Sequence, residues 1–594
     1  MCGIAGQLRF SGPNIEVVRR MTAALAHRGP DGETFFQDGP VALGHRRLSI
    51  IDLAGGSQPL FNEDKSVAVI LNGEIYNYKE LQAELKARHT LRTESDTEVL
   101  VHLYEDHGED FVQKLRGMFA FALWDARAQK LVCGRDRYGE KPFVYAPNDD
   151  GLTFASELRA LVSAGVPTGS IDRDALSDYL ELLYIPAPRT IYAGVKKLPA
   201  GHLLIADARG VRVRRYWDMP IPGSRHHVPA DAGPELRRRL EDAVRLQLRS
   251  DVPVAALLSG GIDSSTIVAL MARELGPGVK TFSVGFGRQD DELPFAREVA
   301  SRYETDHTEL IITDDLVKQT VEGLSAYSEP FGDSSAVPTV AVFREVAKHV
   351  KVVLTGDGGD ELFAGYGQYR RLAWLPHFPG AQLLDRLPSV VPRARSVRRA
   401  GRAIGADGGR RHRALIEVFS PRERRALLGR VHEPVAARFL PSDVDSGLAF
   451  DLDVYLPDDL LVKVDSGAMR WSLEARAPFL DAPVGEFAIP FPSQAKQDRD
   501  VGKLLLKRSV AELLPASILA RAKMGFGSPV EQWLKGPLRH LVEDFLGPLS
   551  ARVRTHLDGR SVDHVLEDSR AGRGNPHQVW ALLALERWFR AASA

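Results

Sequence analysis

The sequence predicts two domains of mixed α/β class: an N-terminal half that mixes strands with helices, and a C-terminal half built on a parallel sheet. The chain has 594 residues, whereas single hydrophobic cores stop growing near ~250–300 residues, so at least two domains are expected. Residues 217–234 are rich in Pro and Gly and lack periodicity, which is typical of a linker. We therefore expect domains at residues 1–216 and 235–594.

Short strands and helices alternate in the first 200 residues. Apolar runs of strand length lie at Val67–Leu71, Met118–Trp124 and Lys130–Cys133. The first run ends at Asn72-Gly73, a dipeptide typical of turns. Helical spacing of apolar residues predicts helices at Tyr78–Arg88 and Thr97–Tyr104.

From residue 234 onward, strands and helices follow one another regularly, which is the pattern of a parallel sheet covered on both faces. Strands are expected at Val252–Leu258, Thr281–Phe286, His307–Ile312 and Lys351–Thr355. Helices are expected at Pro234–Ser250, Ser264–Glu274, Leu293–Tyr303 and Val340–Lys348. After about residue 366 the pattern is mainly helical.

Composition and charge restrict the class of protein. Hydrophobic residues make up 44% and charged residues 26% of the chain, as in ordinary globular proteins. The net charge of −1 argues against a nucleic-acid partner. The sequence has neither a signal-peptide pattern nor a run approaching ~20 apolar residues, so we expect a cytoplasmic protein without membrane contact. Two cysteines, Cys2 and Cys133, exclude a disulfide scaffold and fit a reducing compartment.

One basic cluster stands out against this neutral background. An anion or nucleic-acid patch is conceivable there, but aromatic residues are absent and the whole chain is neutral, so we interpret the cluster as a solvated helical surface. Its members are Arg393, Arg395, Arg398, Arg399, Arg402, Arg410, Arg411 and Arg413.

Cys2 follows the initiator methionine, and its small side chain should permit removal of Met1. The thiol would then lie beside its own α-amino group, whose ordinary pKa of about 7.7–8.0 makes it a usable general base at neutral pH. One residue would thus supply both nucleophile and base. Cys133 ends an apolar strand pattern and is interpreted as an inert buried thiol.

The segments that follow Cys2 together resemble the class II glutamine amidotransferase domain, an N-terminal-nucleophile hydrolase with an αββα sandwich. The resemblance extends from residue 2 to about residue 200. It is carried by MCGIAG at 1–6, HRGPD at 27–31, HRRLSIID at 45–52, NGEIYN at 72–77, SDTE at 95–98, GMFAFA at 117–122 and GRDR at 134–137.

The resemblance implies a glutamine site whose residue types suit the chemistry. A guanidinium, Arg47, suits the α-carboxylate of glutamine, and a carboxylate, Asp96, suits its ammonium. The side-chain amide of Asn72 and the backbone N–H of Gly73 would stabilise the oxyanion formed by thiolate attack. Leu48, Ile51 and Glu74 lie at positions that contact glutamine in the family. Matching residues interpreted as mainly structural are Arg135, Asp136, Arg137 and Glu157.

A phosphate-binding loop is predicted at the start of the second domain. An apolar strand runs into Ser259-Gly260-Gly261-Ile262-Asp263-Ser264-Ser265 and then into a helix. Glycines let backbone N–H groups approach phosphate oxygens, and a helix N-terminus favours negative charge. The pattern SGGxDS lacks the lysine of a Walker A loop and resembles the ATP pyrophosphatases, which cleave ATP between its α and β phosphates.

Further segments extend that resemblance to the glutamine-hydrolysing asparagine synthetases, over almost the whole chain. By resemblance, Leu257, Ser259, Gly260, Gly261, Asp263, Ser264, Val284, Thr355 and Gly356 bind ATP. An aspartate inside a phosphate loop requires a cation, so Mg²⁺ is expected on Asp263, and the resemblance implies that Asp360 shares this ion. Asp357 would face the acceptor and the attacking ammonia, and Lys523 would neutralise phosphate charge, with Lys503 and Lys507 as weaker candidates. The segments are TGDGGDELFAGY at 355–366, Asp458–Asp465, LEARAPFLD at 473–481 and RAKMGFG at 521–527.

Two departures leave the acceptor open. Some asparagine synthetases have glutamate where this chain has Asp357, and EPFGDSSAVP at 329–338 belongs to a broad subgroup that includes enzymes with other acceptors. The first expectation is aspartate, converted to asparagine through an adenylate with ammonia passing through an interior channel. A different carboxylate of cell-wall or secondary metabolism is the alternative.

Three other readings fit the residues less well. A lactam synthetase type of cyclase would typically lack Cys2, and a non-catalytic scaffold would not be expected to keep both residue sets. Other class II amidotransferases lack SGGxDS. Relatives are often homodimers, so a homodimer is a possible assembly.

Overall fold

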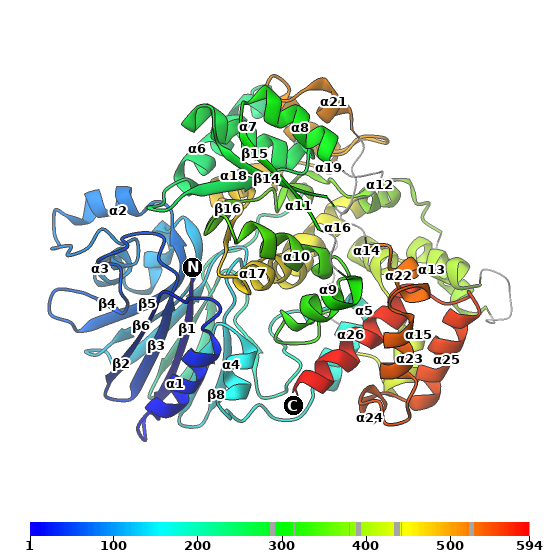
Figure 1. Cartoon of the computed structure of the whole chain (residues 1–594), viewed down its shortest axis with the longest axis horizontal. Helices are drawn as coiled ribbons and strands as arrows, with labels where there is room; N and C mark the ends of the chain where they lie inside the picture. Colours follow the sequence, from blue (N-terminus) through cyan, green and yellow to red (C-terminus); the bar gives the residue numbers. More distant parts are fainter. Residues whose placement is uncertain are drawn as a thin grey trace.

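The computed structural model describes residues 1–285, 292–312, 315–378, 380–387, 394–432, 440, 442–521 and 528–592. The expected site residue Lys523, the end of the strand expected at Thr281–Phe286, and Arg393 of the basic cluster lie outside the described residues. Figure 1 shows two regions, with the N-terminal strands on one side and the helix-rich remainder of the chain on the other.

The N-terminal region contains two six-stranded antiparallel sheets. The first has the order β10-β8-β9-β1-β3-β2 and the second the order β12-β11-β7-β6-β5-β4. Strands of the first sheet are β1 (Cys2–Arg9), β2 (Gly32–Asp38), β3 (Val41–Arg47), β8 (Val144–Asn148), β9 (Gly151–Ala155) and β10 (Lys196–Lys197). Strands of the second are β4 (Leu60–Phe61), β5 (Val67–Ile75), β6 (Gly117–Asp125), β7 (Lys130–Arg135), β11 (His202–Asp207) and β12 (Gly210–Arg215).

Helices cover the outer faces of both sheets, so the region is the expected αββα sandwich. Buried side chains from the inner faces, including Ile4, Leu43, Trp124 and Leu204, form one core between the sheets. On the outer face of the second sheet lie α2 (Tyr78–Leu85) and α3 (Glu98–His107). On the outer face of the first lie α1 (Ile15–Ala24) and α4 (Leu158–Ser163).

The predicted turn at Asn72-Gly73 is wrong, because β5 continues through both residues to Ile75. Its partner β6 pairs with it along the whole length, from Val67 opposite Asp125 to Ile75 opposite Gly117. These cross-strand pairs outweigh the local turn preference. Gly73, which tolerates backbone angles that other residues avoid, is accommodated inside the strand. As a result, both residues lie in a rigid sheet.

The second region is built on a parallel sheet of five strands in the order β15-β14-β13-β16-β17. The strands are β13 (Val254–Leu257), β14 (Lys280–Gly285), β15 (Asp306–Ile311), β16 (Val352–Leu354) and β17 (Glu474–Arg476). The helices that alternate with them are α6 (Ala232–Gln247), α7 (Ile262–Leu275), α8 (Leu293–Arg302) and α10 (Ala336–Val346). Four of these strands and all four helices match the expected elements to within a few residues, and β17 is an addition that local periodicity did not reveal.

Helices dominate the remainder of the chain, as expected after residue 366. They include a π-helical segment, Asp451–Leu460, that runs into α17, and π segments are frequent at functional sites. The helices are α5 (Arg173–Leu182), α9 (Leu316–Ser325), α11 (Gly359–Phe363), α12 (Gly367–Trp374), α13 (Ala394–Gly405), α14 (Gly408–Ile416), α15 (Pro421–Leu428), α16 (Asp443–Phe450), α17 (Leu461–Met469), α18 (Ala482–Ala488), α19 (Ser493–Lys496), α20 (Leu504–Val510), α21 (Ala516–Ala520), α22 (Val530–Lys535), α23 (Arg539–Leu546), α24 (Val553–His556), α25 (Gly559–Arg570) and α26 (Pro576–Ala592).

The described arginines of the basic cluster bind groups of the chain itself. Arg402 pairs with Glu417, Arg411 with Asp443, and Arg413 with the buried Glu181. Such pairs fix helices to one another. Because these three side chains are largely buried, they are not the solvated surface that was expected. Among the described residues, no helix has the length and apolarity needed to cross a membrane.

Candidate active sites

The first site lies where β1, β3 and β5 meet. The antiparallel register places Cys2 opposite Arg47. From the other sheet, Asn72 accepts a hydrogen bond at Oδ1 from the backbone N–H of Cys2, at 3.1 Å. Asn72 is fully buried, and its Nδ2 has no hydrogen-bond partner within the part of the chain that the structure describes. A buried, unused donor is costly unless a ligand uses it, so Nδ2 beside Cys2 is suited to bind an oxyanion.

Gly73 is required at its position by sterics. Its φ of +146° lies outside the range that side-chain-bearing residues favour, and a Cβ there would lie 2.0 Å from the carbonyl oxygen of Met118. The strand geometry that Gly73 permits keeps Asn72 and Glu74 on β5 in line with β6.

Arg47 is oriented by the loop that follows β3. Its guanidinium donates to the carbonyl oxygens of Ile51 at 3.3 Å, Leu53 at 3.2 Å and Asp52. These bonds hold a partly buried cation beside Cys2. Leu48 is buried and Ile51 is half-buried, and both belong to the loop that orients Arg47. We name the region bordered by these residues, Cys2 and Asn72 the Cys2 recess.

Acidic residues line the opposite side of that recess. The α-ammonium of Met1 donates to Glu474 Oε2 at 2.6 Å and lies 4.0 Å from Glu74 Oε1. Burial raises the pKa of Asp96 to about 6, although its Oδ2 accepts a hydrogen bond from the N–H of Ile75. Burial, with Glu474 and Asp96 close by, also raises the pKa of Glu74 well above its ordinary value. An ammonium group is therefore the natural occupant of this recess.

Glu474 belongs to β17 of the other domain, and its role at this site was not anticipated. Burial opposes its ionisation, but the Met1 ammonium and Arg476 lower its pKa to about 2. The sequence signal for it was LEARAPFLD, which carried the family resemblance without pointing to the glutamine site.

Arg28 is a second unanticipated residue. It is fully buried and donates to the carbonyl oxygen of Cys2 at 3.1 Å, to Glu157 at 2.9 Å and to Asp465 of α17 at 2.8 Å. One guanidinium thus joins the nucleophile's backbone to both domains. Glu157 has a structural position in this network, and Asp136 likewise accepts from the backbone N–H groups of the following turn, including those of Glu140 and Lys141 at 2.9 and 3.0 Å.

The two thiols have different surroundings. Burial raises the pKa of both Cys2 and Cys133, and the thiol of Cys133 has no nearby charge that offsets the effect. The N-terminal ammonium lowers the pKa of Cys2. Removal of Met1 would move that amine onto Cys2 itself, beside Asn72 Oδ1.

The second site is a cavity of about 640 Å³ at the carboxyl edge of the parallel sheet. Because β13, β14 and β16 are parallel neighbours, the loops that follow them meet at one edge. Expected ATP-binding residues that line the cavity are Leu257, Ser259, Gly261, Asp263, Ser264, Val284, Thr355 and Gly356, together with Asp357, Asp360, Lys503 and Lys507.

The loop between β13 and α7 is shaped to receive an anion. Ser259 and Ser264 hydroxyls lie 3.0 Å apart, and no side chain caps the helix that begins at Ile262. Uncapped N–H groups at a helix start attract negative charge. Gly260 is an exception among the expected residues, since it does not line the cavity. A Cβ on Gly260 would lie 2.5 Å from Phe295 Cβ, so this glycine permits close packing against α8.

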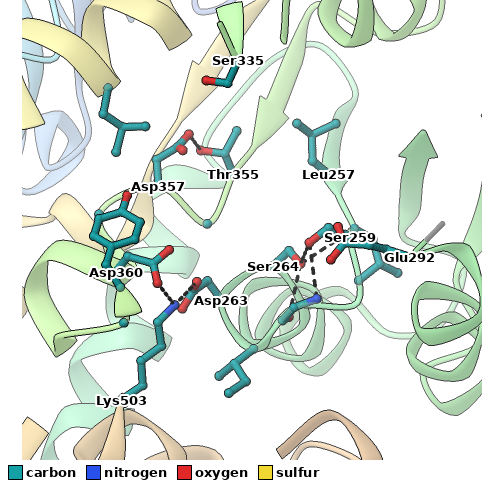
Figure 2. Close-up of a pocket in the computed structure, with 18 of the residues that line it drawn as sticks. Leu257, Ser259, Asp263, Ser264, Glu292, Ser335, Thr355, Asp357, Asp360 and Lys503 are labelled. Atoms are coloured by element: carbon teal, nitrogen blue, oxygen red, sulfur yellow. Dashed lines mark hydrogen bonds and ion pairs between the residues drawn. The ribbon is translucent and has the colours of Figure 1, made fainter. Parts of the chain in front are cut away.

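The two expected metal ligands converge on one cation. Lys503 Nζ pairs with Asp360 Oδ1 at 2.7 Å and also with Asp263, as Figure 2 shows. Both carboxylates are buried and belong to different elements, α7 and α11. Two carboxylates that share a positive charge at the mouth of a phosphate-binding loop are suited to hold Mg²⁺.

Asp357 and Lys463 of α17 also line the cavity. Asp357 accepts a hydrogen bond from Thr355 Oγ1 at 2.7 Å (Figure 2). Lys463 Nζ donates to Asp333 at 2.6 Å and to Ser335 Oγ at 2.9 Å. The cavity therefore offers both a cation and several carboxylates beyond the phosphate loop.

Strand β17 joins the two sites. Glu474 at its first position binds the Met1 ammonium, and the carbonyl oxygen of Arg476 at its last position accepts from the N–H of Thr355 at 2.8 Å. Three residues in a strand span about 7 Å between the first and last Cα. The Cys2 recess and the nucleotide cavity thus lie near opposite ends of the short strand β17.

Comparison with known proteins agrees with both sites. The model of the glutamine amidotransferase domain matches residues 1–217, and the model named asparagine synthase matches residues 235–590. The chain belongs to the asparagine synthase family. It is 34% identical to asparagine synthetase [glutamine-hydrolyzing] 1 of Bacillus subtilis, over 99% of this chain and 96% of the relative.

Other relatives resemble the chain over nearly its full length. A putative asparagine synthetase [glutamine-hydrolyzing] of Mycobacterium bovis is 33% identical over 99% of this chain and 97% of the relative. Amidase chry2 of Gibberella zeae is 28% identical over 96% of this chain and 95% of the relative. The chain is thus a ligase of the glutamine-dependent asparagine synthetase type.

Proposed function

We propose that this enzyme hydrolyses glutamine at Cys2 and transfers the ammonia to an ATP-activated carboxylate, with L-aspartate as the first candidate acceptor. The observation that carries the proposal is the arrangement around β17. A nucleophile with an unused oxyanion donor lies at one end, and a phosphate-binding cavity lies at the other.

In the glutaminase half, we propose that Met1 is removed and that the α-amine of Cys2 accepts the thiol proton. Sγ attacks the amide carbon, and Asn72 Nδ2 with the N–H of Gly73 stabilises the oxyanion. The amine returns the proton to the departing NH₃, and water then hydrolyses the glutamyl thioester to glutamate. Arg47 holds the α-carboxylate of glutamine, while Glu74, Asp96 and the hydrophobic Leu48 and Ile51 complete the pocket.

In the synthetase half, a carboxylate oxygen of the acceptor attacks the α-phosphorus of ATP and pyrophosphate departs. Ammonia then attacks the acyl carbon, AMP departs, and an amide forms. The loop with Ser259, Gly261 and Ser264 binds the phosphates, and Thr355 and Gly356 lie beside the nucleotide. Asp263 and Asp360 would hold Mg²⁺, which would supply positive charge against the phosphate oxygens.

Asp357 is placed to accept a proton from the attacking ammonia, because it lies in the cavity next to Thr355. Lys523 stays a predicted contributor to phosphate neutralisation. We propose the same role for Lys503, because its ammonium group contacts both expected metal ligands.

A protected route for ammonia follows from its chemistry. In bulk water at neutral pH, ammonia is mostly protonated and loses its nucleophilicity. Strand β17 is buried and links Glu474, which contacts Met1, to Arg476, whose carbonyl oxygen accepts from the N–H of Thr355 in the cavity. We propose that ammonia passes along this strand from the recess of Cys2 to Asp357.

The cavity chemistry supports an amino-acid acceptor. An α-ammonium requires a carboxylate such as Asp333, and an α-carboxylate requires a cation such as Lys463, and both line the cavity. Aspartate supplies these groups together with a second carboxylate for adenylation. A different carboxylate is the second candidate, because a relative over almost the full chain is named an amidase and because Asp357 leaves more room than glutamate.

The test is pyrophosphate release by purified enzyme with Mg-ATP and glutamine, with and without L-aspartate, combined with mass detection of the product. Aspartate-dependent release with asparagine formed supports the first candidate. Glutaminase activity without aspartate-dependent release would reject aspartate and leave the second candidate.

Two expectations about the molecule as a whole are kept as proposals. Residues 217–234 are proposed to link a glutaminase domain at 1–216 to a synthetase domain at 235–594. A cytoplasmic location is proposed on the ground that both thiols are free and buried, as befits a reducing compartment.

A further inference from the structure

Four side chains that belong to neither active site converge at the outer edge of the second sheet. Glu63 lies between β4 and β5, His89 follows α2, and His102 with Glu105 lies one turn apart on α3. One ligand-type atom of each lies within 4.8 Å of the others. We name these four residues the His–Glu cluster.

The histidine–carboxylate distances within the His–Glu cluster are close to those between the ligands of a tetrahedral metal site. His89 Nδ1 lies 3.4 Å from Glu63 Oε1 and 3.9 Å from Glu105 Oε2. His102 Nδ1 lies 3.6 Å from Glu63 Oε2 and 3.4 Å from Glu105 Oε2. Zinc ligated by imidazole nitrogen and carboxylate oxygen at ~2.0–2.1 Å would separate its ligands by about 3.3–3.4 Å. The ligand-type atoms of all four residues lie within 4.8 Å of one another, so the side chains would rotate inward when they bind the ion.

His102 supplies an independent indication of a ligand. Its side chain is fully buried, yet neither ring nitrogen has a hydrogen-bond partner among the residues that the structure describes. Nδ1 instead faces the carboxylates of Glu63 and Glu105 beyond normal hydrogen-bond length. Buried imidazole nitrogens normally have partners, so a bound cation would account for this orientation.

Outer contacts orient the cluster as they do in known zinc sites, where ligating histidines give their second nitrogen to a carboxylate. His89 Nε2 lies 3.1 Å from Asp106 Oδ1, and His102 Nε2 points to Glu98 at 3.8 Å. Glu63 Oε1 accepts from the N–H of Thr90 at 2.9 Å, and Glu105 Oε1 accepts from Asn62 Nδ2 at 2.7 Å. Each carboxylate thereby keeps its Oε2 turned toward His102.

Charge at the cluster also favours a cation. In the described ion pairs, Glu63 and Glu105 meet histidines and no lysine or arginine. A divalent cation would neutralise both carboxylates at once.

We propose that the His–Glu cluster binds one Zn²⁺ in a closed, four-ligand structural site. Two imidazoles and two carboxylates in tetrahedral arrangement are a zinc-type donor set. Side-chain exposure of 12% for His89, 23% for Glu105 and 38% for Glu63 gives the ion access from solvent.

The bound ion would brace the segment that carries Asp96. Glu98, next to His102 on α3, accepts from the backbone N–H groups of Arg92 and Thr93, both at 2.7 Å. Zinc would fasten α3, which follows this segment, to His89 and Glu63, which precede it. A consequence for glutamine binding rests on the proposed glutaminase function, but the zinc binding itself does not.

The experiment uses the full chain, freed of purification tags and chelators and titrated with Zn²⁺ against a chromophoric indicator, with metal content measured after gel filtration. Variants are H89Q and E105Q, whose side chains are partly exposed. The matched control is H107Q, an exposed histidine of the same helix that lies outside the cluster. Circular dichroism checks that each variant is folded.

The wild type and H107Q should retain one equivalent of zinc, and H89Q and E105Q should retain none. Asp106→Asn, which changes an outer contact, should weaken binding by ~10–100-fold. Co²⁺ should give the visible bands of four-coordinate cobalt in wild type and lose them in H89Q. Stoichiometric binding that persists in both ligand variants, or less than a tenth of an equivalent in wild type, would overturn the proposal.

Discussion

Replacing Asn72 with alanine tests the oxyanion role directly. In the structure Asn72 Nδ2 is a buried donor without a partner among the described residues, while Oδ1 accepts from the N–H of Cys2 at 3.1 Å. Removal of one preorganised oxyanion donor costs ~3–4 kcal/mol of transition-state stabilisation, or ~10²–10³ in kcat. Loss of the Oδ1 bond adds ~1–3 kcal/mol of destabilisation to the fold, because the N–H of Cys2 stays buried.

The assay compares two nitrogen sources in one protein. Glutaminase kcat of Asn72→Ala should fall by ~10²–10³, whereas pyrophosphate release with saturating ammonium chloride should change by less than about twofold, since Asn72 does not line the nucleotide cavity. Asn77→Ala is the control, because Asn77 lies beyond the end of β5 and its side chain bonds only to residues 114 and 116 in the described structure. A glutaminase rate within tenfold of wild type would refute the oxyanion role, and equal loss of both activities would indicate that the variant is misfolded.

Two further predictions concern charge at the two sites. Asp263→Asn should abolish pyrophosphate release with either nitrogen source and leave glutaminase activity intact, because Asp263 lies in the nucleotide cavity. Normal amide synthesis by this variant would contradict the assignment of Asp263 as a metal ligand. With the pKa of Asp96 at about 6, its carboxylate is mostly ionised at pH 7 and about one-tenth ionised at pH 5, so the affinity for the glutamine ammonium should fall ~10-fold over that range. Calorimetric titration of glutamine into Cys2→Ala, which removes the thiol chemistry, measures this, and an unchanged affinity would contradict the role of Asp96.

Much of the fold could be predicted from local patterns. Strands of a parallel sheet can be recognised in a sequence as continuous apolar runs between helices. The strands β13, β14, β15 and β16 were all expected on that basis. The turn predicted at the Asn72-Gly73 dipeptide was wrong, because the local turn preference is weaker than the nine residue pairs that β5 makes with β6. β17 was missed because three residues are too few for a periodic signal.

The site was predictable where one motif carries the chemistry and unpredictable where distant residues meet. SGGIDSS and NGEIYN are contiguous, so their roles could be inferred from residue types. Contacts between Met1 and Glu474, separated by 473 positions, and between Arg28 and Asp465, separated by 437, depend on how the two domains pack. Lys503 was predicted only as a weaker candidate for the same reason, because no residue near it in the sequence indicates a contact with Asp263 or Asp360.

Cys2→Ala in the pyrophosphate assay tests the central claim of two separable sites most directly. With glutamine as the nitrogen source, the variant should form no amide product, because no other described thiol lies at the recess. With ammonium chloride it should form product at the rate of the wild type, because the nucleotide cavity does not include Cys2. Loss of both activities, or glutamine-dependent synthesis that survives the substitution, would contradict the account.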